Sequence, residues 1–431
     1  MPRFRFVETR GPGDATTAAF SAELVAASAP YAGATLRLAP ASPPMAPHDE
    51  VVFLLHTAAE IEHALMAQYL FLAFSLPISR GLWRGKLMQI AKEEMGHLLS
   101  MQNALIAVGG PLNFDRQDTP FRIFYPFPLS LEPFAIRSLA RFVLAEAPTA
   151  EAIPAEMGFD SAEVHADAEL GGEVLDVRRI GALFDRLIEL ADGLSDTSDF
   201  TPGSESWQAD PVVWQAAFHD LRLAKVRNRT ELIALLRDIS DQGEGTRTVG
   251  LGAKSHFQRL FELYKAAKAE AMVHGAASLA QPITPNPSVE NDQAPGYLTD
   301  PLSRAWGEIF NLRYRWLLLM LQHGLMLKPG QARDQLQAWA MTEMRQTITP
   351  IARRMVLLPQ LEGAAAGPRA GPPFEMPYSL NLPFRPADLW REHQLMARQS
   401  IAQLGALPPG EQLAATLIEM DQERLDLLST F

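Results

Sequence analysis

The 431-residue sequence predicts an all-α protein. In most long segments, apolar residues recur at the three- and four-residue spacing of amphipathic helices, and prolines or glycines close these segments. The alternation of apolar and polar residues that is typical of half-buried strands is almost absent. A composition of 47% apolar and 20% charged residues is typical of a globular protein with a large core.

Two groups of predicted helices follow an N-terminal arm at 1–48 that is rich in Pro, Gly and Ala. Pro77 ends the first helix, Gly109 and Gly110 end the second, and Pro148 ends the third. The first group, at 49–275, comprises helices near 50–76, 82–108, 131–147, 177–194, 230–240 and 253–272, with an insertion at about 149–229. The second group, at 297–431, comprises helices near 301–326, 332–357, 387–404 and 409–428. We expect the second group to pack on the first.

Charge and composition exclude several classes of function. A formal net charge of −12 argues against a nucleic-acid partner, which would need a basic surface. The chain has no cysteine, so Glu, Asp and His must hold any metal, which favours iron or manganese over a structural zinc. The N-terminus lacks an apolar core of signal-peptide length, and the longest apolar run, 316–327, is too short to cross a bilayer. We expect a cytoplasmic protein without a membrane partner; its oligomeric state, a homo-oligomer included, stays open.

The stretch KEEMGHLL at 92–99 places two acids and a histidine in an apolar helix. Glu94 lies in the centre of the apolar stripe and His97 lies at its margin one turn later, whereas Glu93 points away from the stripe. A Glu-x-x-His pair of this kind holds iron or manganese in four-helix bundles. An unpaired carboxylate on an apolar face costs several kcal/mol, so a metal or a buried cation is expected beside Glu94.

Two further helices place a glutamate on an apolar face. Glu62 lies at the edge of the first helix's stripe, whereas Glu60 and His63 project away from it and are interpreted as solvated. Glu146 follows the apolar positions of the third helix at helical spacing. Three helices that each direct one glutamate inward match the ligand arrangement of di-iron bundles. Tyr69 shares the face of Glu62 and is either a partner of such a centre or a core aromatic, and we favour the core.

The fourth corner of the predicted site is incomplete. A second Glu-x-x-His pair is expected on the fourth helix, where the best histidine is His256 in AKSHFQRLFELY. The residue three positions earlier is Ala253, which is not an acid. Glu244, in the upstream stretch QGEGT, is a candidate to supply the missing carboxylate from a turn. The alternative interpretation of His256 is a hydrogen-bonded core histidine.

These segments resemble the ferritin-like domain of the iminophenyl-pyruvate dimer synthase type, which is named for bacterial pathways such as those to violacein, rebeccamycin and staurosporine. The resemblance covers about residues 50–270, and the EExxH block that runs into Gly-Gly is its most specific part. It rests on EIEHALMAQYL (60–70), IAKEEMGHLLSMQNALIAVGG (90–110), FVLAEAP (142–148), QGEG (242–245) and SHFQRLFEL (255–263), with a weaker echo in GPPFEMP (371–377).

The resemblance implies a ferritin-like four-helix bundle with long insertions and a C-terminal helical region. It implies metal ligation by four residues, with two further candidates: Glu62, Glu94, His97 and Glu146, then Glu244 and His256. Members of this group in pigment pathways couple two amino-acid-derived imines oxidatively, and they are much longer than this chain.

Three functional hypotheses stay open at this point. The first is a di-iron oxidoreductase that activates dioxygen or peroxide against a small, aromatic substrate, with the aromatic-rich segment 121–134 as a lid or pocket wall. The second is an iron-handling or peroxide-scavenging protein without an organic substrate. The third is a helical scaffold that has lost its metal, which Ala253 favours.

Overall fold

The fold is all-α, as the sequence predicts. The computed structural model describes residues 44–116, 129–170, 179–219, 221–245, 254–364, 366–376, 380, 383 and 385–429. Within these ranges the chain forms helices and a few isolated β-bridges, but no strand. No helix in the described ranges is long and apolar enough to span a membrane.

The N-terminal two thirds of the chain form eight α-helices among the described residues. They are α2 (Pro47–Ser75), α3 (Gly81–Ala107), α4 (Ile136–Glu146), α5 (Ser161–Ala168), α6 (Gly181–Asp192), α7 (Pro211–Ala217), α8 (Arg229–Glu244) and α9 (His256–His274). The C-terminal third contains α10 (Pro301–Met326), α11 (Gln331–Thr342), the π-helical segment η6 (Glu343–Ile348), α12 (Thr349–Met355), α13 (Pro386–Gly405) and α14 (Gln412–Leu428).

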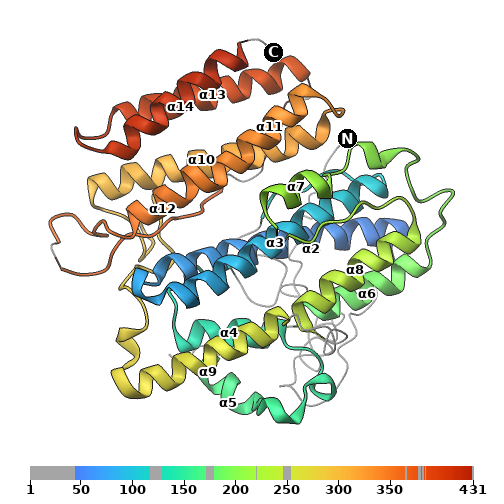
Figure 1. Ribbon diagram of the computed structural model, residues 1–431, viewed down its shortest axis with the longest axis horizontal. Coiled ribbons are helices and arrows are strands. Elements are labelled where there is room, and N and C mark those ends of the chain that lie inside the picture. Colours follow the sequence, from blue (N-terminus) through green and yellow to red (C-terminus); the bar gives the residue numbers. More distant parts are fainter. Residues whose placement is uncertain are drawn as a thin grey trace, which may run out of the picture.

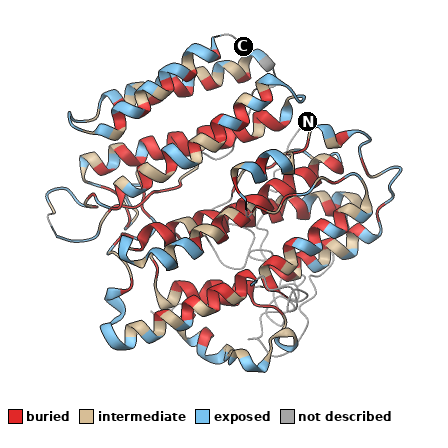
Figure 2. Cartoon of the chain, viewed as in Figure 1, coloured by how far each residue is buried: buried red, intermediate tan, exposed pale blue. Residues whose placement is uncertain are grey.

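The helices form layers (Figure 1). The long antiparallel pair α2 and α3 lies in the middle. Helices α4, α6, α8 and α9 cover one side of this pair, α10 to α12 cover the other, and α13 with α14 form the outermost layer. Because α2 and α3 are enclosed on both sides, they are buried along most of their length, whereas α13 and α14 expose much of their surface (Figure 2).

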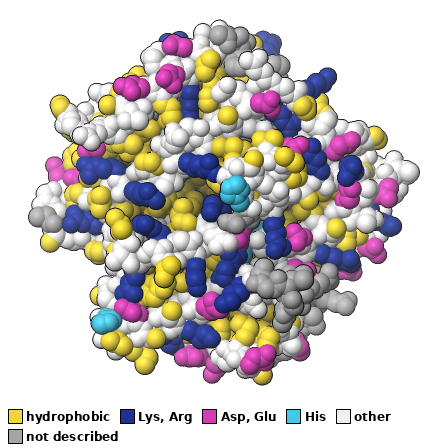
Figure 3. All heavy atoms as spheres, in the orientation of Figure 1, with side chains coloured by type: hydrophobic (Ala, Val, Ile, Leu, Met, Phe, Trp, Pro, Cys, Tyr) yellow, Lys and Arg dark blue, Asp and Glu magenta, His cyan; other side chains and the backbone are white. Residues whose placement is uncertain are grey.

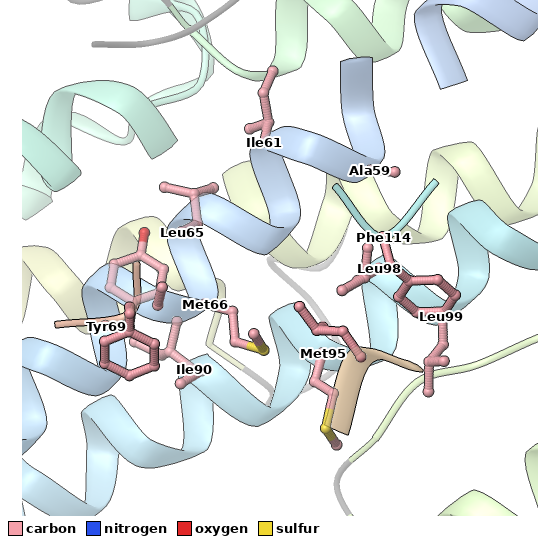
Figure 4. Close-up of a cluster of buried hydrophobic side chains, with 14 of the residues drawn as sticks. Ala59, Ile61, Leu65, Met66, Tyr69, Ile90, Met95, Leu98, Leu99 and Phe114 are labelled. Atoms are coloured by element: carbon pink, nitrogen blue, oxygen red, sulfur yellow. The ribbon is translucent and has the colours of Figure 1, made fainter. Parts of the chain in front are cut away.

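The core between α2 and α3 consists of apolar side chains from both helices (Figure 4). Leu65 and Met66 of α2 and Met95 and Leu98 of α3 are all buried there. A buried leucine or methionine of this size contributes roughly 1.5–3 kcal/mol relative to an exposed one. This packing holds the two helices that carry the EIEH and EEMGH stretches in a fixed register.

Two rods of the bundle each consist of two helices placed end to end, α4 with α6 and α9 with α8. The break between the two helices lies at the same level in both rods (Figure 1). In Figure 1, α4 and α6 follow one another along one line, and α9 and α8 do the same. The first junction is held by the amide of Ile180, which donates to the carbonyl of Ala145 at 3.1 Å. The second rod resumes at a capping box: the Ser255 hydroxyl accepts from the amide of Gln258 at 3.2 Å, and the Gln258 side chain accepts from the amide of Ser255 at 3.1 Å.

Several predicted boundaries were wrong for local reasons. The third helix begins at residue 136 instead of 131, because the Ser138 hydroxyl accepts from the amide of Ala135 and donates to the carbonyl of Pro133. The predicted helix over 332–357 is confirmed as continuous helical structure over 331–355, although its middle part, η6, is π-helical. The short helices α5 and α7 lie inside the segment that the sequence left as an insertion. The arm at 1–48 is described only from residue 44, and the aromatic segment 121–134 only from 129.

The segment GPPFEM (371–376), which belongs to the weaker part of the family resemblance, lies between α2 and α10. A Cβ at Gly371 would lie 2.8 Å from the Phe71 ring, so only glycine permits this approach. Phe374 is fully buried with φ of +50°, and its ring packs edge-on against Tyr314 of α10. Its carbonyl accepts from Arg116 at 2.5 Å. This segment therefore joins the C-terminal helices to the bundle.

Candidate metal centre

Five of the predicted residues meet at the point where the two rods are broken. Two groups of three side chains each place their ligand atoms within 4.8 Å of one another, and all are buried. The first group is Glu62, Glu94 and His97, and the second is Glu94, Glu146 and His256. Glu94 belongs to both groups, which is the arrangement expected for a carboxylate that bridges two ions.

Both histidines turn the same ring nitrogen toward the carboxylates. His97 Nδ1 lies 2.8 Å from Glu94 Oε2 and 3.3 Å from Glu62 Oε2. His256 Nδ1 lies 2.9 Å from Glu94 Oε1 and 3.7 Å from Glu146 Oε1. The two rings stack with their centroids 5.5 Å apart. Each Nδ1 therefore faces two carboxylates of its own group.

The Nε2 atoms of both histidines form hydrogen bonds on the side of the ring away from the carboxylates. His97 Nε2 donates to Gln242 Oε1 at 2.9 Å, and His256 Nε2 donates to Glu93 Oε2 at 2.9 Å. A partner of this kind fixes the tautomer and orientation of a ligating imidazole. Neither Gln242 nor Glu93 was recognised as part of the site from the sequence.

Glu93 is the clearest correction at this site. The sequence placed it away from the apolar stripe, but it is buried and binds the guanidinium of Arg259 through both oxygens. Burial alone would raise the pKa of Glu93, but hydrogen bonds from His256 and Arg259 lower it to about 2. Glu93 is therefore a buried anion whose charge is shared by Arg259 and His256.

Glu60 and His63 were also interpreted wrongly. His63 is fully buried, and its Nε2 bonds the Tyr314 hydroxyl of α10 instead of water. Burial and the nearby Arg116 lower the pKa of His63 to about 3, so its ring is neutral. Glu60 is half-buried and accepts from the side-chain amide of Asn113 at 3.2 Å. Neither residue belongs to the two groups that contain Glu62, Glu94, His97, Glu146 and His256.

Tyr69 combines the two interpretations considered for it. Its ring is buried beside Phe142, with centroids 4.8 Å apart, and is part of the core. Its hydroxyl donates to Glu146 Oε1 at 2.8 Å. Burial and the Glu146 carboxylate raise the pKa of Tyr69, so the phenol keeps its proton. Tyr69 therefore orients Glu146 within the second group.

Glu244 lines the same cavity without joining either group. It is the last residue of α8 and not part of a turn, contrary to the prediction from the sequence. Arg179 Nη2 donates to Glu244 Oε1 at 2.7 Å, and a Cβ at Gly181 would lie only 1.8 Å from that oxygen. Burial raises the pKa of Glu244 to about 7, although Arg179 opposes this shift. Ala253, the other uncertain position, lies outside the described residues.

The charges of the first group are strongly coupled. Burial and the neighbouring Glu94 carboxylate raise the pKa of Glu62 to about 8. Burial alone would lower the pKa of His97, but Glu62 and Glu94 raise it to about 10. At neutral pH and without an ion, Glu62 and His97 would therefore both hold a proton, and a bound cation would release these protons.

The cavity at this centre is small. Its volume is about 20 Å³, and it lies between the four broken helix ends and α2 and α3. This is enough for about one or two water-sized molecules. A larger chamber of about 480 Å³ lies on the other side of Glu93 and Gln242, the two residues that hold the histidines.

Part of the chain matches a known protein family. The ferritin-like family model matches residues 55–265, which include every residue of the two groups. Residues 55–265 form a ferritin-like domain. A solved ferritin-like protein from Caulobacter vibrioides aligns with 70% of this chain and 95% of its own, with a TM-score of 0.42 and 16% identity.

Two curated relatives of the predicted type match a larger share of the chain. Dichlorochromopyrrolate synthase of Lentzea aerocolonigenes is 27% identical over 385 residues, which cover 77% of this chain and 36% of the relative. The 2-imino-3-(indol-3-yl)propanoate dimerase of Chromobacterium violaceum is 27% identical over 363 residues, which cover 75% of this chain and 33% of the relative. The chain thus spans about a third of the length of these relatives.

Proposed function

We propose that this chain is a non-haem di-metal oxidoreductase that activates dioxygen or peroxide. The observation that carries the proposal is the pair of buried ligand groups that share Glu94. The donor set contains only carboxylates and imidazoles, which suits iron, with manganese as the alternative. We also propose that the protein works in the cytoplasm, as the sequence predicts.

The residues present fit a pair of ions. Among the described side chains, Glu94 Oε1 is buried and has no hydrogen-bond partner, although His256 Nδ1 lies 2.9 Å away. The two atoms are paired by charge, and a buried carboxylate oxygen that accepts no well-aligned hydrogen bond is available to a cation. One ion would be held by Glu62, Glu94 and His97, and the other by Glu94, Glu146 and His256.

The chain's own groups prepare this site for redox chemistry. A pair of such ions, when bound, supplies the binding and reduction of dioxygen or peroxide. Gln242 and Glu93 hold the Nε2 protons of the two histidines, which leaves both Nδ1 atoms free to ligate. Tyr69 keeps a proton on the Glu146 side of the centre. The enclosing apolar side chains exclude bulk water.

We further propose that the substrate is an amino-acid-derived imine or another small aromatic molecule. The support is the pair of relatives, whose names describe the synthesis of dichlorochromopyrrolate and the dimerisation of an indolyl-iminopropanoate. Because the chain spans only about a third of these relatives, imine coupling rests on the resemblance of the ferritin-like part.

A second candidate function is peroxide scavenging or iron handling without an organic substrate. The small volume of the metal-centre cavity favours it, because about 20 Å³ admits peroxide or dioxygen but no aromatic molecule. The large chamber behind the histidines favours the first candidate.

Elemental analysis of the purified protein tests the proposal. We expect about two irons per chain after iron-replete expression. Glu94→Gln should lose most of this metal, whereas Glu60→Gln, on the far side of α2, should retain it. A wild-type protein without bound iron or manganese would make the chain a metal-free scaffold. If the protein does contain metal, dioxygen consumption that depends on an added indolyl or phenyl imine would favour the oxidoreductase over the scavenger.

A further inference from the structure

We propose that the chamber behind the two histidines binds a small organic carboxylate, and that Arg222 is its principal recognition group. This inference rests on the proposed function, because it assigns the organic substrate of that centre to a place in the structure. The chamber has a volume of about 480 Å³, which lies in the range of sites for small molecules.

The chamber lies one layer of side chains away from the metal centre. Its inner wall includes Glu93 and Gln242, which are the hydrogen-bond partners of His256 and His97. The metal-centre cavity itself is too small for an aromatic molecule. A substrate in the chamber would therefore contact the residues that hold the ligands, and not the ions.

The charges on the chamber wall favour an anion. Arg259 and Glu93 neutralise one another, and the other charged residues of the described wall are Arg222, Lys254 and Asp241. Arg222 and Lys254 also pair with Asp238 and Glu262, which lie outside the wall, so an anion in the chamber would compete with these two acids. The N-terminus of α9, at Ser255, adds the positive end of a helix dipole. Figure 3 shows Lys and Arg side chains spread over the visible face of the molecule, among acidic and hydrophobic ones.

Among the described residues, the two cations pair with partially exposed carboxylates. Arg222 pairs with Asp238 at 3.0 Å, with the two side chains 38% and 53% exposed. Lys254 pairs with Glu262 at 2.5 Å, with 58% and 36% exposed. Exposed pairs of this kind contribute about 0–1 kcal/mol, so a carboxylate in the chamber can replace the existing partner.

The segment that carries Arg222 packs closely against α3. The carbonyl of Arg222 approaches α3 at Gly96, where a Cβ would lie 2.7 Å from that oxygen. Farther along the same segment, the side chain of Asn103 donates to the carbonyl of Ala224 at 2.9 Å, and Gln208 forms two hydrogen bonds with the backbone of Val226. The glycine of the EEMGH stretch therefore allows the recognition wall to pack directly against the helix that carries Glu93 and Glu94.

The test compares a carboxylate with its neutral amide on the full-length protein. Isothermal titration should show binding of 3-phenylpropanoate, and about tenfold weaker binding of 3-phenylpropanamide, because a charge-assisted bond is lost. Inorganic phosphate should bind more weakly than the aromatic acid, because Leu221 supplies apolar contact in the chamber. Equal affinity for the acid and the amide would overturn the proposal, and so would phosphate binding as tight as that of the acid.

Two variants locate the site. Arg222→Gln should weaken 3-phenylpropanoate binding by about tenfold. Arg227→Gln is the matched control, because Arg227 lies on the same segment and also pairs with a carboxylate of α8, Glu231, but is not part of the chamber wall. Unchanged affinity in Arg222→Gln, or an equal loss in both variants, would contradict the assignment.

The titrations are run on both chelator-treated and iron-loaded protein, with the metal content measured separately. Binding that depends on Arg222 in a protein that takes up no metal would leave the chamber in place and refute the di-metal proposal. Metal uptake without carboxylate binding that depends on Arg222 would support the di-metal proposal and refute the assignment of the chamber.

Discussion

Glu93 and His256, 163 residues apart in the chain, form a buried pair in which His256 Nε2 donates to Glu93 Oε2 at 2.9 Å. The pair links α3 to the first residue of α9 and fixes which nitrogen of the imidazole faces the carboxylates. The equivalent partner of His97 is the neutral amide of Gln242. The two proposed metal positions therefore differ in the charge behind their histidines.

Glu93→Gln should weaken one metal position and leave the other intact. The side-chain amide of this variant can still accept the hydrogen bond from His256, but it lacks the negative charge of Glu93. That charge makes the imidazole more basic and therefore a stronger metal ligand. Loss of such a partner lowers metal affinity by about 10–100-fold. Titration with Co²⁺ under anaerobic conditions should therefore show one weakened site and one unchanged site. Two unchanged sites would show that Glu93 serves only to pair Arg259.

Ligand variants should separate the two positions by stoichiometry. We expect Glu94→Ala to remove both ions, because Glu94 is common to both groups, and His256→Ala to remove about half of the metal, because only the second group contains His256. Metal analysis after dialysis measures both. Full metal content in His256→Ala, with a lowered melting temperature, would make His256 a core histidine and the centre a one-metal site.

The comparison between sequence and structure shows where helical phase is informative. Glu62, Glu94 and Glu146 were placed on inward faces because each follows apolar residues at helical spacing. The same rule failed for Glu93 and His63, because α2 and α3 are covered on both sides at these two positions, where both residues are buried (Figure 2). In an enclosed helix, a polar residue off the apolar stripe points into a second buried layer instead of water.

The partners of these residues could not be predicted for a different reason. Arg259 reaches Glu93 across 166 residues, and Tyr314 reaches His63 across 251. Such contacts depend on how the layers stack, and no local spacing encodes them. The start of α9 after Ser255 was visible in the sequence in principle, because Ser255 and Gln258, three residues apart, form a capping box.

Gly96→Ala and Gly85→Ala should change stability in opposite directions. A methyl group on Gly96 would lie 2.7 Å from the backbone oxygen of Arg222, so we expect a loss of about 1–3 kcal/mol from overpacking. At Gly85 of the same helix, nothing lies within 4 Å of the added carbon, and alanine should gain up to about 1 kcal/mol from its helix propensity. Urea unfolding measures both. Equal effects would show that the segment at Arg222 moves freely from α3.

Arg313→Met should be among the most destabilising substitutions in the C-terminal helices. The Arg313 guanidinium is fully buried and binds Glu343 at 2.5 and 2.8 Å and Asp421 at 2.5 Å. Removal of one partner from such a network leaves uncompensated buried charge and costs about 3–5 kcal/mol. The control is Arg315→Gln on the same helix, whose exposed pair with Glu392 contributes about 0–1 kcal/mol. Similar melting temperatures for the two variants would contradict the expectation.

The buried histidine pair of the C-terminal helices should destabilise the protein as the pH falls. Trp316 Nε1 donates to His393 Nδ1 at 3.0 Å, so the His393 proton lies on Nε2, which is 3.0 Å from His323 Nδ1. Burial lowers the pKa of His323 to about 4, and burial together with His323 lowers that of His393 to about 3. Both values lie below the unfolded value of about 6.5.

The direction in which the unfolding free energy changes with pH follows from the number of protons bound by the unfolded and folded states. Between about pH 6.5 and pH 4 the unfolded chain binds protons that the folded pair does not, so stability falls as the pH is lowered, by about 1.4 kcal/mol per group and pH unit. His323→Gln removes one of these groups but keeps an acceptor for His393, so the slope of the unfolding free energy between pH 6 and pH 5 should decrease by about that amount. The control is His274→Gln, because this side chain is 59% exposed and should leave the slope unchanged. A wild-type slope in His323→Gln would show that the histidine pair is protonated in the folded protein.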